Sequence, residues 1–276
     1  MKRILLIAAS TAALGGCSWL GYGDRGYDAA TYAATYGAPH GATYAAQKPC
    51  CKPTLSKYNF EAAVGPSFIV GGDAVTPDGT NPSTGTALNE LDMDDLYDTG
   101  VRVEAGVSKM LNPNRKATLM GHYVKHDSAG VQDWGTVNGA PLTGALSDYE
   151  AFGAELGLRQ YGRISPFPLV RSVRPYVEGR IGASRVDDIA IVNSNIAPNS
   201  EIPFYDESWV ATGAGLVGVE TPFIGRSTLG LETGIRYTAG LDSDNSALAP
   251  GNPIRGANNG GEKWTVPVML RGRFRF

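Results

Sequence analysis

Residues 229–240 read Leu-Gly-Leu-Glu-Thr-Gly-Ile-Arg-Tyr-Thr-Ala-Gly. Every second residue from Leu229 is apolar or threonine, while the residues between them are glycine, charged or threonine. An apolar period of two is typical of a β-strand that has one apolar face. The stretch therefore predicts a strand with Glu232 and Arg236 on the face opposite to Leu231 and Ile235.

The same alternation recurs in seven further segments. They are residues 58–70, 101–108, 116–126, 152–159, 176–183, 208–221 and 266–276. Glycine accounts for 36 of the 276 residues and charged residues for only 18%, a composition that favours strands and turns. We therefore predict an all-β fold with eight strands.

Short and long connections alternate between these segments. The short ones are residues 112–114, 165–168 and 224–226, and the long ones are residues 73–93, 129–147, 188–203 and 243–262. Outer-membrane barrels have short periplasmic turns, longer outer loops and an even number of strands. We predict an eight-stranded antiparallel up-and-down transmembrane β-barrel over residues 57–276. A soluble lipocalin-like barrel is the alternative fold.

The end of the chain supports the membrane interpretation. Val268, Leu270, Phe274 and Phe276 follow one another on a single face of the last segment. This ending resembles the C-terminal signal that the barrel-assembly machinery reads, and residues 58–276 resemble the OmpA transmembrane domain and the small OmpX-type barrels. The resemblance implies that Phe274 and Phe276 form the assembly signal, that the machinery is a partner, and that both termini are periplasmic.

The N-terminus has the features of a secretory signal. Met1-Lys2-Arg3 is positively charged, residues 4–13 are apolar, and Leu14-Gly15-Gly16-Cys17 follows. The tetrad resembles the lipobox of bacterial lipoproteins. The resemblance implies a signal peptide over residues 1–16, diacylglycerol and an N-acyl chain on Cys17, and, with Ser18 next, sorting to the outer membrane. No other cofactor is expected.

Residues 17–56 form a predicted linker rich in Ala, Gly and Tyr. It holds three Ala-Thr-Tyr tripeptides, ending at Tyr32, Tyr36 and Tyr44, and the adjacent Cys50 and Cys51. These five residues are candidates for docking an envelope partner, and a plain flexible spacer is the alternative. The cysteines have no Cys or His group at metal-ligand spacing, so we expect no metal site.

The polar faces of the eight segments carry both signs of charge. If the apolar faces point to lipid, six glutamates and seven arginines face the lumen, where they can pair. The predicted network contains Glu61, Arg102, Glu104, Glu155, Arg159, Glu178, Arg180, Glu220, Glu232, Arg236, Arg271, Arg273 and Arg275. We expect this network to plug the barrel, and a narrow gated channel is the alternative.

The two ends of the predicted barrel differ in charge. Basic residues lie at the short turns: Arg115, Lys116, Arg163, Arg171, Arg174 and Arg226. Acidic residues lie at the long loops: Asp92, Asp94, Asp95, Asp98, Asp127, Asp133, Asp187, Asp188, Asp242 and Asp244. We expect solvated acidic loops near lipopolysaccharide. Aromatic girdles are predicted to include Tyr58, Tyr97, Tyr123, Tyr149, Trp209 and Tyr237.

One short motif suggests catalysis. His126 and Ser128 are two residues apart on a predicted strand and so share a face. They resemble the His-x-Ser-Asn motif of the PagL lipid A deacylases, which implies that His126 is a base and Ser128 a nucleophile. Ala129 stands where that motif has Asn, and no third member is identified.

Charge and hydropathy exclude two classes. The net charge of −3 leaves no basic footprint for nucleic acid, and no stretch after the N-terminus approaches the roughly 18 apolar residues of a membrane-spanning helix. We predict a structural, non-enzymatic outer-membrane barrel lipoprotein that holds an envelope partner through its linker and basic periplasmic rim. A narrow channel and a lipid A deacylase are the alternatives.

Overall fold

The computed structural model describes residues 58–76, 85–163, 165–167, 170–195, 200–224, 227–246 and 255–275. The predicted signal peptide with Cys17, the linker with its tyrosines and cysteines, and Phe276 lie outside the described residues. No helix in the described ranges is long and apolar enough to cross a membrane.

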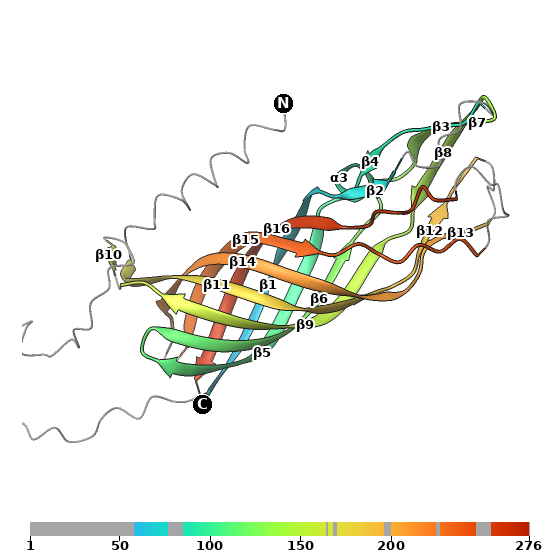
Figure 1. The fold of residues 1–276 in the computed structure, drawn as a ribbon. Coiled ribbons are helices and arrows are strands. Elements are labelled where there is room, and N and C mark those ends of the chain that lie inside the picture. The colour runs from blue at the N-terminus through green and yellow to red at the C-terminus, as the bar shows by residue number, and fades with distance from the viewer. Residues whose placement is uncertain are drawn as a thin grey trace, which may run out of the picture. The chain divides into compact units, whose positions relative to one another are not determined.

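Eight long antiparallel strands close into a barrel (Figure 1). They are β1 (Tyr58–Gly71), β5 (Gly100–Asn112), β6 (Arg115–His126), β9 (Tyr149–Tyr161), β11 (Val170–Val186), β14 (Ser208–Pro222), β15 (Thr228–Thr238) and β16 (Lys263–Arg275). Each strand pairs with the next along the chain, and β16 pairs back with β1. The predicted all-β class and closed eight-stranded barrel are confirmed.

The alternation of residues places one face of every strand in the lumen. In β5, for example, Val101 and Val103 are exposed whereas Arg102 and Glu104 are buried. The register aligns lumenal residues across strands, so that Glu104 lies opposite His122 of β6 and Ala63 of β1. Side chains distant in sequence are thereby stacked inside the barrel.

The start of the first barrel strand and the end of the last one both lie beside the short turns. Asn59 pairs with Arg275, and Tyr58 pairs with Lys109 close to the turn at Pro113. The three-residue strand β10 (Ser165–Phe167) pairs with β11 in another short connection. The first and last strands therefore start and finish at the same end, as the sequence predicted.

The long connections contain structure beyond the eight predicted strands. We call the described parts of residues 73–97, 127–148, 187–207 and 239–262 the cap. Its elements are β2 (Asp73–Val75), β3 (Ala87–Leu88), β4 (Leu91–Asp92), α3 (Met93–Leu96), β7 (Gln132–Val137), β8 (Ala140–Leu146), β12 (Ile189–Val192) and β13 (Ile202–Tyr205). Five of these strands form one sheet in the order β13-β12-β8-β7-β3, and β2 pairs with β4.

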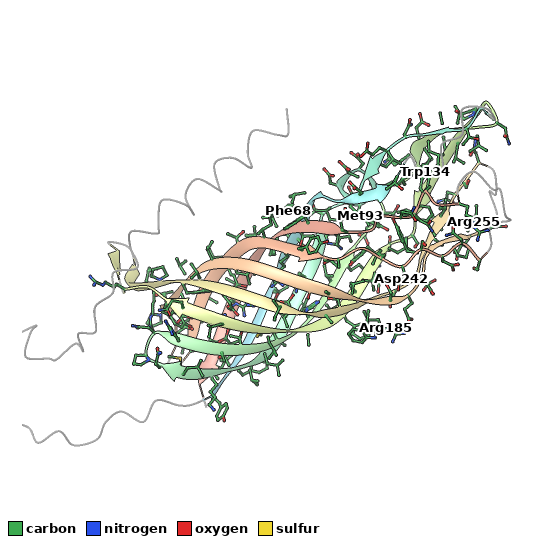
Figure 2. The ribbon with its side chains drawn as sticks, viewed as in Figure 1. Phe68, Met93, Trp134, Arg185, Asp242 and Arg255 are labelled. Carbon is green, nitrogen blue, oxygen red and sulfur yellow. The ribbon has the colours of Figure 1, made fainter. Side chains whose placement is uncertain are left out.

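The cap has an apolar core. Met93, Trp134, Phe204 and Tyr205 are buried in one cluster with side chains from all four long connections. Figure 2 labels Met93 and Trp134. The Trp134 and Phe204 rings meet edge to face at 5.4 Å, and the Trp134 Nε1 group donates to the Gly144 carbonyl at 3.1 Å. The prediction of solvated acidic loops is therefore incomplete: the acidic side chains Asp94 and Asp95 are exposed, but the segments that carry them fold around a core.

The barrel exterior is apolar. Large hydrophobic side chains are exposed on all eight strands, for instance Leu156 at 62% and Ile181 at 73%. Aromatic residues gather at the cap end, where Phe152 lies 6.2 Å from Trp209 and Tyr237 lies 4.7 Å from Trp264 between ring centroids.

Two residues that the sequence assigned to the girdles lie elsewhere. Tyr97 and Tyr149 are buried, and their rings contact each other at 6.0 Å between centroids. Tyr97 belongs to a connection that folds into the cap, and Tyr149 points into the barrel mouth, so neither faces the exterior.

Candidate functional site

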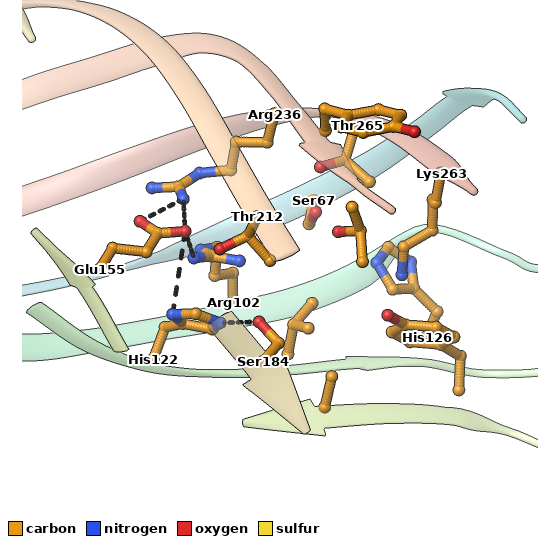
Figure 3. Close-up of a pocket in the computed structure, with 15 residues that line it drawn as sticks. Ser67, Arg102, His122, His126, Glu155, Ser184, Thr212, Arg236, Lys263 and Thr265 are labelled. Carbon is orange, nitrogen blue, oxygen red and sulfur yellow. Dashed lines mark hydrogen bonds and ion pairs between the residues drawn. The ribbon is translucent and has the colours of Figure 1, made fainter. Parts of the chain in front are cut away.

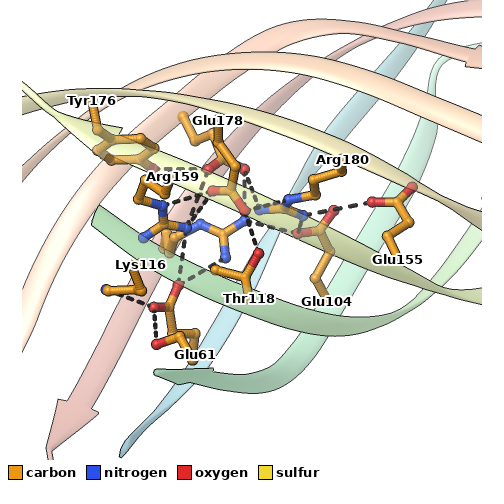
Figure 4. A network of polar contacts seen from close by, with 12 residues as sticks. Glu61, Glu104, Lys116, Thr118, Glu155, Arg159, Tyr176, Glu178 and Arg180 are labelled. Atoms are coloured by element: carbon orange, nitrogen blue, oxygen red, sulfur yellow. Dashed lines mark hydrogen bonds and ion pairs between the residues drawn. The ribbon is translucent and has the colours of Figure 1, made fainter. Parts of the chain in front are cut away.

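The barrel lumen is filled by ion pairs. The predicted lumenal glutamates and arginines that the structure describes are all buried: Glu61, Arg102, Glu104, Glu155, Arg159, Glu178, Arg180, Glu220, Glu232, Arg236, Arg271 and Arg273. The side chain of Arg275 lies outside the described residues. Figure 4 shows part of the network.

Glu104 occupies the middle of this network. Its two carboxylate oxygens contact four arginines, with N···O distances of 2.6 Å to Arg236 and 2.8 Å to each of the others. The other three arginines are Arg102, Arg180 and Arg271. Because these five residues come from β5, β11, β15 and β16, the cluster spans the lumen.

A second cluster lies nearer the short turns. Glu61 accepts hydrogen bonds from Ser108 at 2.6 Å and Lys116 at 2.9 Å, and lies 3.0 Å from Arg159. Arg159 also contacts Glu178 at 2.6 Å and stacks over the Tyr176 ring at 4.3 Å. Sequence analysis placed Lys116 on the basic rim. The structure shows it buried in the lumen because it occupies an inward position of β6.

The remaining acids are paired in the same way. Glu232 contacts Arg271 at 2.6 Å and accepts from Tyr176 at 2.8 Å, and Glu220 contacts Arg273 at 2.9 Å. Removal of one partner from a buried pair leaves a charge without compensation, which costs about 3–5 kcal/mol. The network is therefore a plug whose members depend on one another.

Basic residues at the short turns are only partly free. Arg174 donates to the Pro113 carbonyl at 2.5 Å and stacks over the Tyr161 ring at 4.2 Å, while Arg115 donates to Gln160. Arg163 is exposed, and the side chains of Arg171 and Arg226 lie outside the described residues. The basic rim thus has less free charge than the sequence suggested.

The structure does not bring the proposed base and nucleophile together. His126 is fully buried, and its Nδ1 lies 3.1 Å from the Asp98 carbonyl oxygen. Ser128 lies beyond the end of β6, where its backbone N–H donates to Asp148 and its Oγ accepts from the Gly130 N–H at 3.3 Å. The two side chains therefore have separate partners and face different surroundings.

A second histidine, His122, lies next to both a serine and a carboxylate. His122 Nε2 lies 2.8 Å from Ser184 Oγ, and His122 Nδ1 lies 3.9 Å from Glu155 (Figure 3). The order serine, histidine, carboxylate is that of an activated nucleophile. However, the adjoining cavity is small, with a volume of about 20 Å³, which holds about one water and not an acyl ester.

Alternation alone could have found His122. It shares the parity of Lys116 and Thr118 on β6, and both of these face the lumen. Its pairing with Ser184 depends on the register of β9 and β11, which no short motif records. Lys263 was also missed, because it precedes the part of the last strand where alternation is clear.

The acidic residues of the cap form no evident metal site. In the described part of the chain, no group of three or more His, Cys, Asp or Glu is arranged to hold a metal. The pKa of Asp92 is raised, first by partial burial and then by the nearby carboxylates of Asp94 and Asp95. The pKa of Asp148 is lowered, chiefly because Lys125 donates a hydrogen bond to it.

Phe274 of the predicted assembly signal lies on the barrel exterior. It is 50% exposed and pairs with Phe60 of β1, with ring centroids 6.5 Å apart. The side chain is therefore accessible from outside the barrel at the end where the chain finishes.

Comparisons with known proteins give structural likenesses only. No protein family model and no curated protein matches the sequence. Among solved structures, Neisserial surface protein A is 10% identical with a TM-score of 0.41, covering 79% of this chain and 97% of its own. The outer membrane protease OmpT from Escherichia coli is 10% identical with a TM-score of 0.45, covering 81% of this chain and 98% of its own. The outer membrane protein OprG from Pseudomonas aeruginosa is 12% identical with a TM-score of 0.40, covering 80% of this chain and 98% of its own.

Proposed function

We propose that this chain is an outer-membrane barrel lipoprotein with a closed lumen, and that it serves as a structural anchor for an envelope partner. The observation that carries the proposal is the combination of an apolar exterior with a lumen filled by ion pairs. A soluble barrel would expose that exterior to water, whereas a bilayer solvates it and leaves the charges inside.

The lengths of the strands support the membrane placement. The eight barrel strands have between 11 and 17 residues, and a tilted membrane strand needs about 9–11. The charge plug argues against a channel. The interior of an eight-stranded barrel is just wide enough for side chains to fill it, and here large charged side chains occupy it.

The proposed topology puts the short turns in the periplasm and the cap outside. The linker then emerges in the periplasm with its lipid on Cys17, while the acidic cap faces lipopolysaccharide. The barrel-assembly machinery would insert the chain by its Phe274 and Phe276 ending. The docking segment is residues 18–56, with Tyr32, Tyr36, Tyr44, Cys50 and Cys51 as its candidate contacts.

Conductance in planar bilayers tests the closed lumen. We expect no current steps above background for the wild-type barrel, because ion-paired side chains fill the described part of the lumen. A matched variant with Glu104, Arg180 and Arg271 all replaced by alanine removes the centre of the plug and should conduct. Steady current steps from the wild-type protein would contradict the closed lumen and favour a channel function.

Partner capture from outer membranes tests the docking role. A protein that co-purifies with the wild-type chain should be lost when residues 28–48 are deleted or when Tyr32 and Tyr36 become alanine. Replacement of Thr31 and Thr35 by alanine is the control, since it keeps the aromatic rings. Equal recovery with all variants would contradict docking through the linker.

Metabolic labelling with a fatty acid tests the anchor. Cys17→Ser should abolish incorporation, whereas Cys50→Ser should leave it unchanged. Label on the Cys17→Ser protein would contradict the lipid anchor.

A further inference from the structure

A small cavity lies between the charge plug and the cap core. Polar side chains on several strands line it, among them Ser67 of β1, His126 of β6, Thr212 of β14 and Lys263 of β16. Figure 3 shows Ser67 and Thr212 between the Lys263 side and the Arg102 side of this cavity. The apolar cap core begins at Val124 and Tyr149, which line the same cavity.

These four lining residues carry polar atoms that have no hydrogen-bond partner. The atoms are Ser67 Oγ, His126 Nε2, Thr212 Oγ1 and Lys263 Nζ, and all four are buried. Ser67, His126 and Lys263 are at most 2% exposed. A buried polar atom without a partner costs about 1–3 kcal/mol, so four beside one cavity indicate an occupant that bonds to them.

Buried basic side chains outnumber buried acidic ones in the barrel as a whole, and Arg102, Arg236, Lys263 and Glu155 line the cavity. Among buried residues that the structure describes, there are six glutamates and eight basic side chains, which are Arg102, Lys116, Arg159, Arg180, Arg236, Lys263, Arg271 and Arg273. Seven of these cations contact a glutamate. Lys263 has no carboxylate within ion-pair distance among the described residues, and its Nζ makes a cation–π contact with the Tyr149 ring, 2.9 Å from the ring centre.

We infer that this cavity is a binding site for a small monovalent inorganic anion of the halide class, held by Lys263 with the hydroxyls of Ser67 and Thr212. All three groups can donate hydrogen bonds, whereas His126 Nε2 is an acceptor, because the ring proton is on the Nδ1 that donates to the Asp98 carbonyl oxygen. The room for about one water also fits a monatomic anion, and it excludes phosphate or sulfate. This inference does not depend on the proposed anchoring function.

Anomalous diffraction from crystals of the full mature chain, refolded in sodium bromide, tests the site directly. We expect a bromide peak in the cavity between Lys263, Ser67 and Thr212. Density for water without an anomalous signal would overturn the inference.

Thermal stability in solution supplies the second test. Bromide should raise the melting temperature in a saturable way, relative to gluconate of equal ionic strength, which is too large for the cavity. Lys263→Met should lose this saturable rise, while Lys125→Met, which removes an exposed lysine of the same barrel end, should keep it. An equal rise in both variants would overturn the inference.

A milder variant covers the case in which Lys263→Met does not fold. Ser67→Ala combined with Thr212→Val removes two donors and leaves the charge in place. The bromide concentration for half of the stabilisation should increase by about 10-fold or more, as expected for two lost hydrogen bonds. An unchanged concentration would overturn the inference, because these two hydroxyls are ligands of the proposed site.

Discussion

One terminal nitrogen of Arg236 lies 2.7 Å from each carboxylate oxygen of Glu155. The two residues belong to β15 and β9, which do not pair with each other in the sheet. The contact therefore crosses the lumen and ties together strands that the backbone hydrogen bonds connect only through their neighbours.

Loss of Arg236 should destabilise the whole barrel. Arg236→Met leaves Glu155 and Glu104 with fewer cations, and breaking a buried pair costs about 3–5 kcal/mol. We expect the variant to unfold in lipid at a lower urea concentration than the wild type. The folded fraction is measured by the mobility shift that folded barrels show in gel electrophoresis. The double variant Arg236→Met with Glu155→Gln should recover part of the loss, because the uncompensated charge is gone.

The control for this prediction is an ion pair outside the lumen. Arg185 and Glu207 form an ion pair, but both side chains are more than a third exposed. Arg185→Met should leave the urea midpoint nearly unchanged, since exposed pairs contribute little to stability. If both arginine variants lost equal stability, the lumenal ion pairs would not be a special source of the barrel's stability.

A charge on the exterior tests the membrane placement. Leu156 is 62% exposed in the middle of β9. If lipid covers it, Leu156→Arg should cost about 2–4 kcal/mol in refolding into liposomes, the range measured for arginine near the bilayer midplane. Val131→Arg is the matched control, because Val131 is 54% exposed in the cap and should tolerate the change. Equal tolerance at both positions would argue against a bilayer around the barrel.

The sequence predicts the barrel well because alternation is a local signal. Leu231 and Glu232 alternate on β15 in the same way that Val103 and Glu104 alternate on β5. The sequence of each strand therefore predicts its outward and lumenal faces without information from the other strands. The lumenal charges follow from that parity. Which glutamate meets which arginine does not, because Arg236 meets Glu155 only through the register of the closed barrel.

The cap escaped prediction for the opposite reason. Its strands are short, as in β3 (two residues) and β12 (four residues), and segments of this length show no usable periodicity. Trp134 is buried by residues of other long connections, which is a property of their packing together. The His126 and Ser128 motif failed similarly, since β6 ends between the two residues and their shared strand face is lost.

Two acidic residues of the cap should respond to pH with opposite signs. The pKa of Asp92 is raised, so its protonated form contributes stability that is lost as the pH rises through the raised pKa. The pKa of Asp244 is lowered by hydrogen bonds from Ser246, so its ionised form contributes stability that is lost as the pH falls.

The matching amide variants separate these effects at neutral pH. Asp92→Asn should slow protease cleavage of the cap, and Asp244→Asn should speed it. Both differences should be small, because both side chains are largely exposed to solvent. Both should fade as the pH falls and the carboxyls protonate, at a higher pH for Asp92 than for Asp244. A change of the same sign in the two variants would contradict the assigned causes.

The cap and the barrel should differ in their dependence on Trp134. This side chain is 1% exposed and touches cap residues, with its ring against Phe204 and its indole N–H bonded to Gly144. Trp134→Ala leaves a cavity in that core and should cost the cap about 3–5 kcal/mol. The barrel keeps its own hydrogen-bonded strands and ion network, so the gel mobility of the folded form should not change. Limited proteolysis should instead cut the long connections at least 10-fold faster, a ratio equivalent to only about 1.4 kcal/mol.

Trp209→Ala is the control, because that ring is 65% exposed on the barrel exterior and its loss leaves the cap core intact. Unfolding of the entire chain in Trp134→Ala would show that cap and barrel form a single cooperative unit.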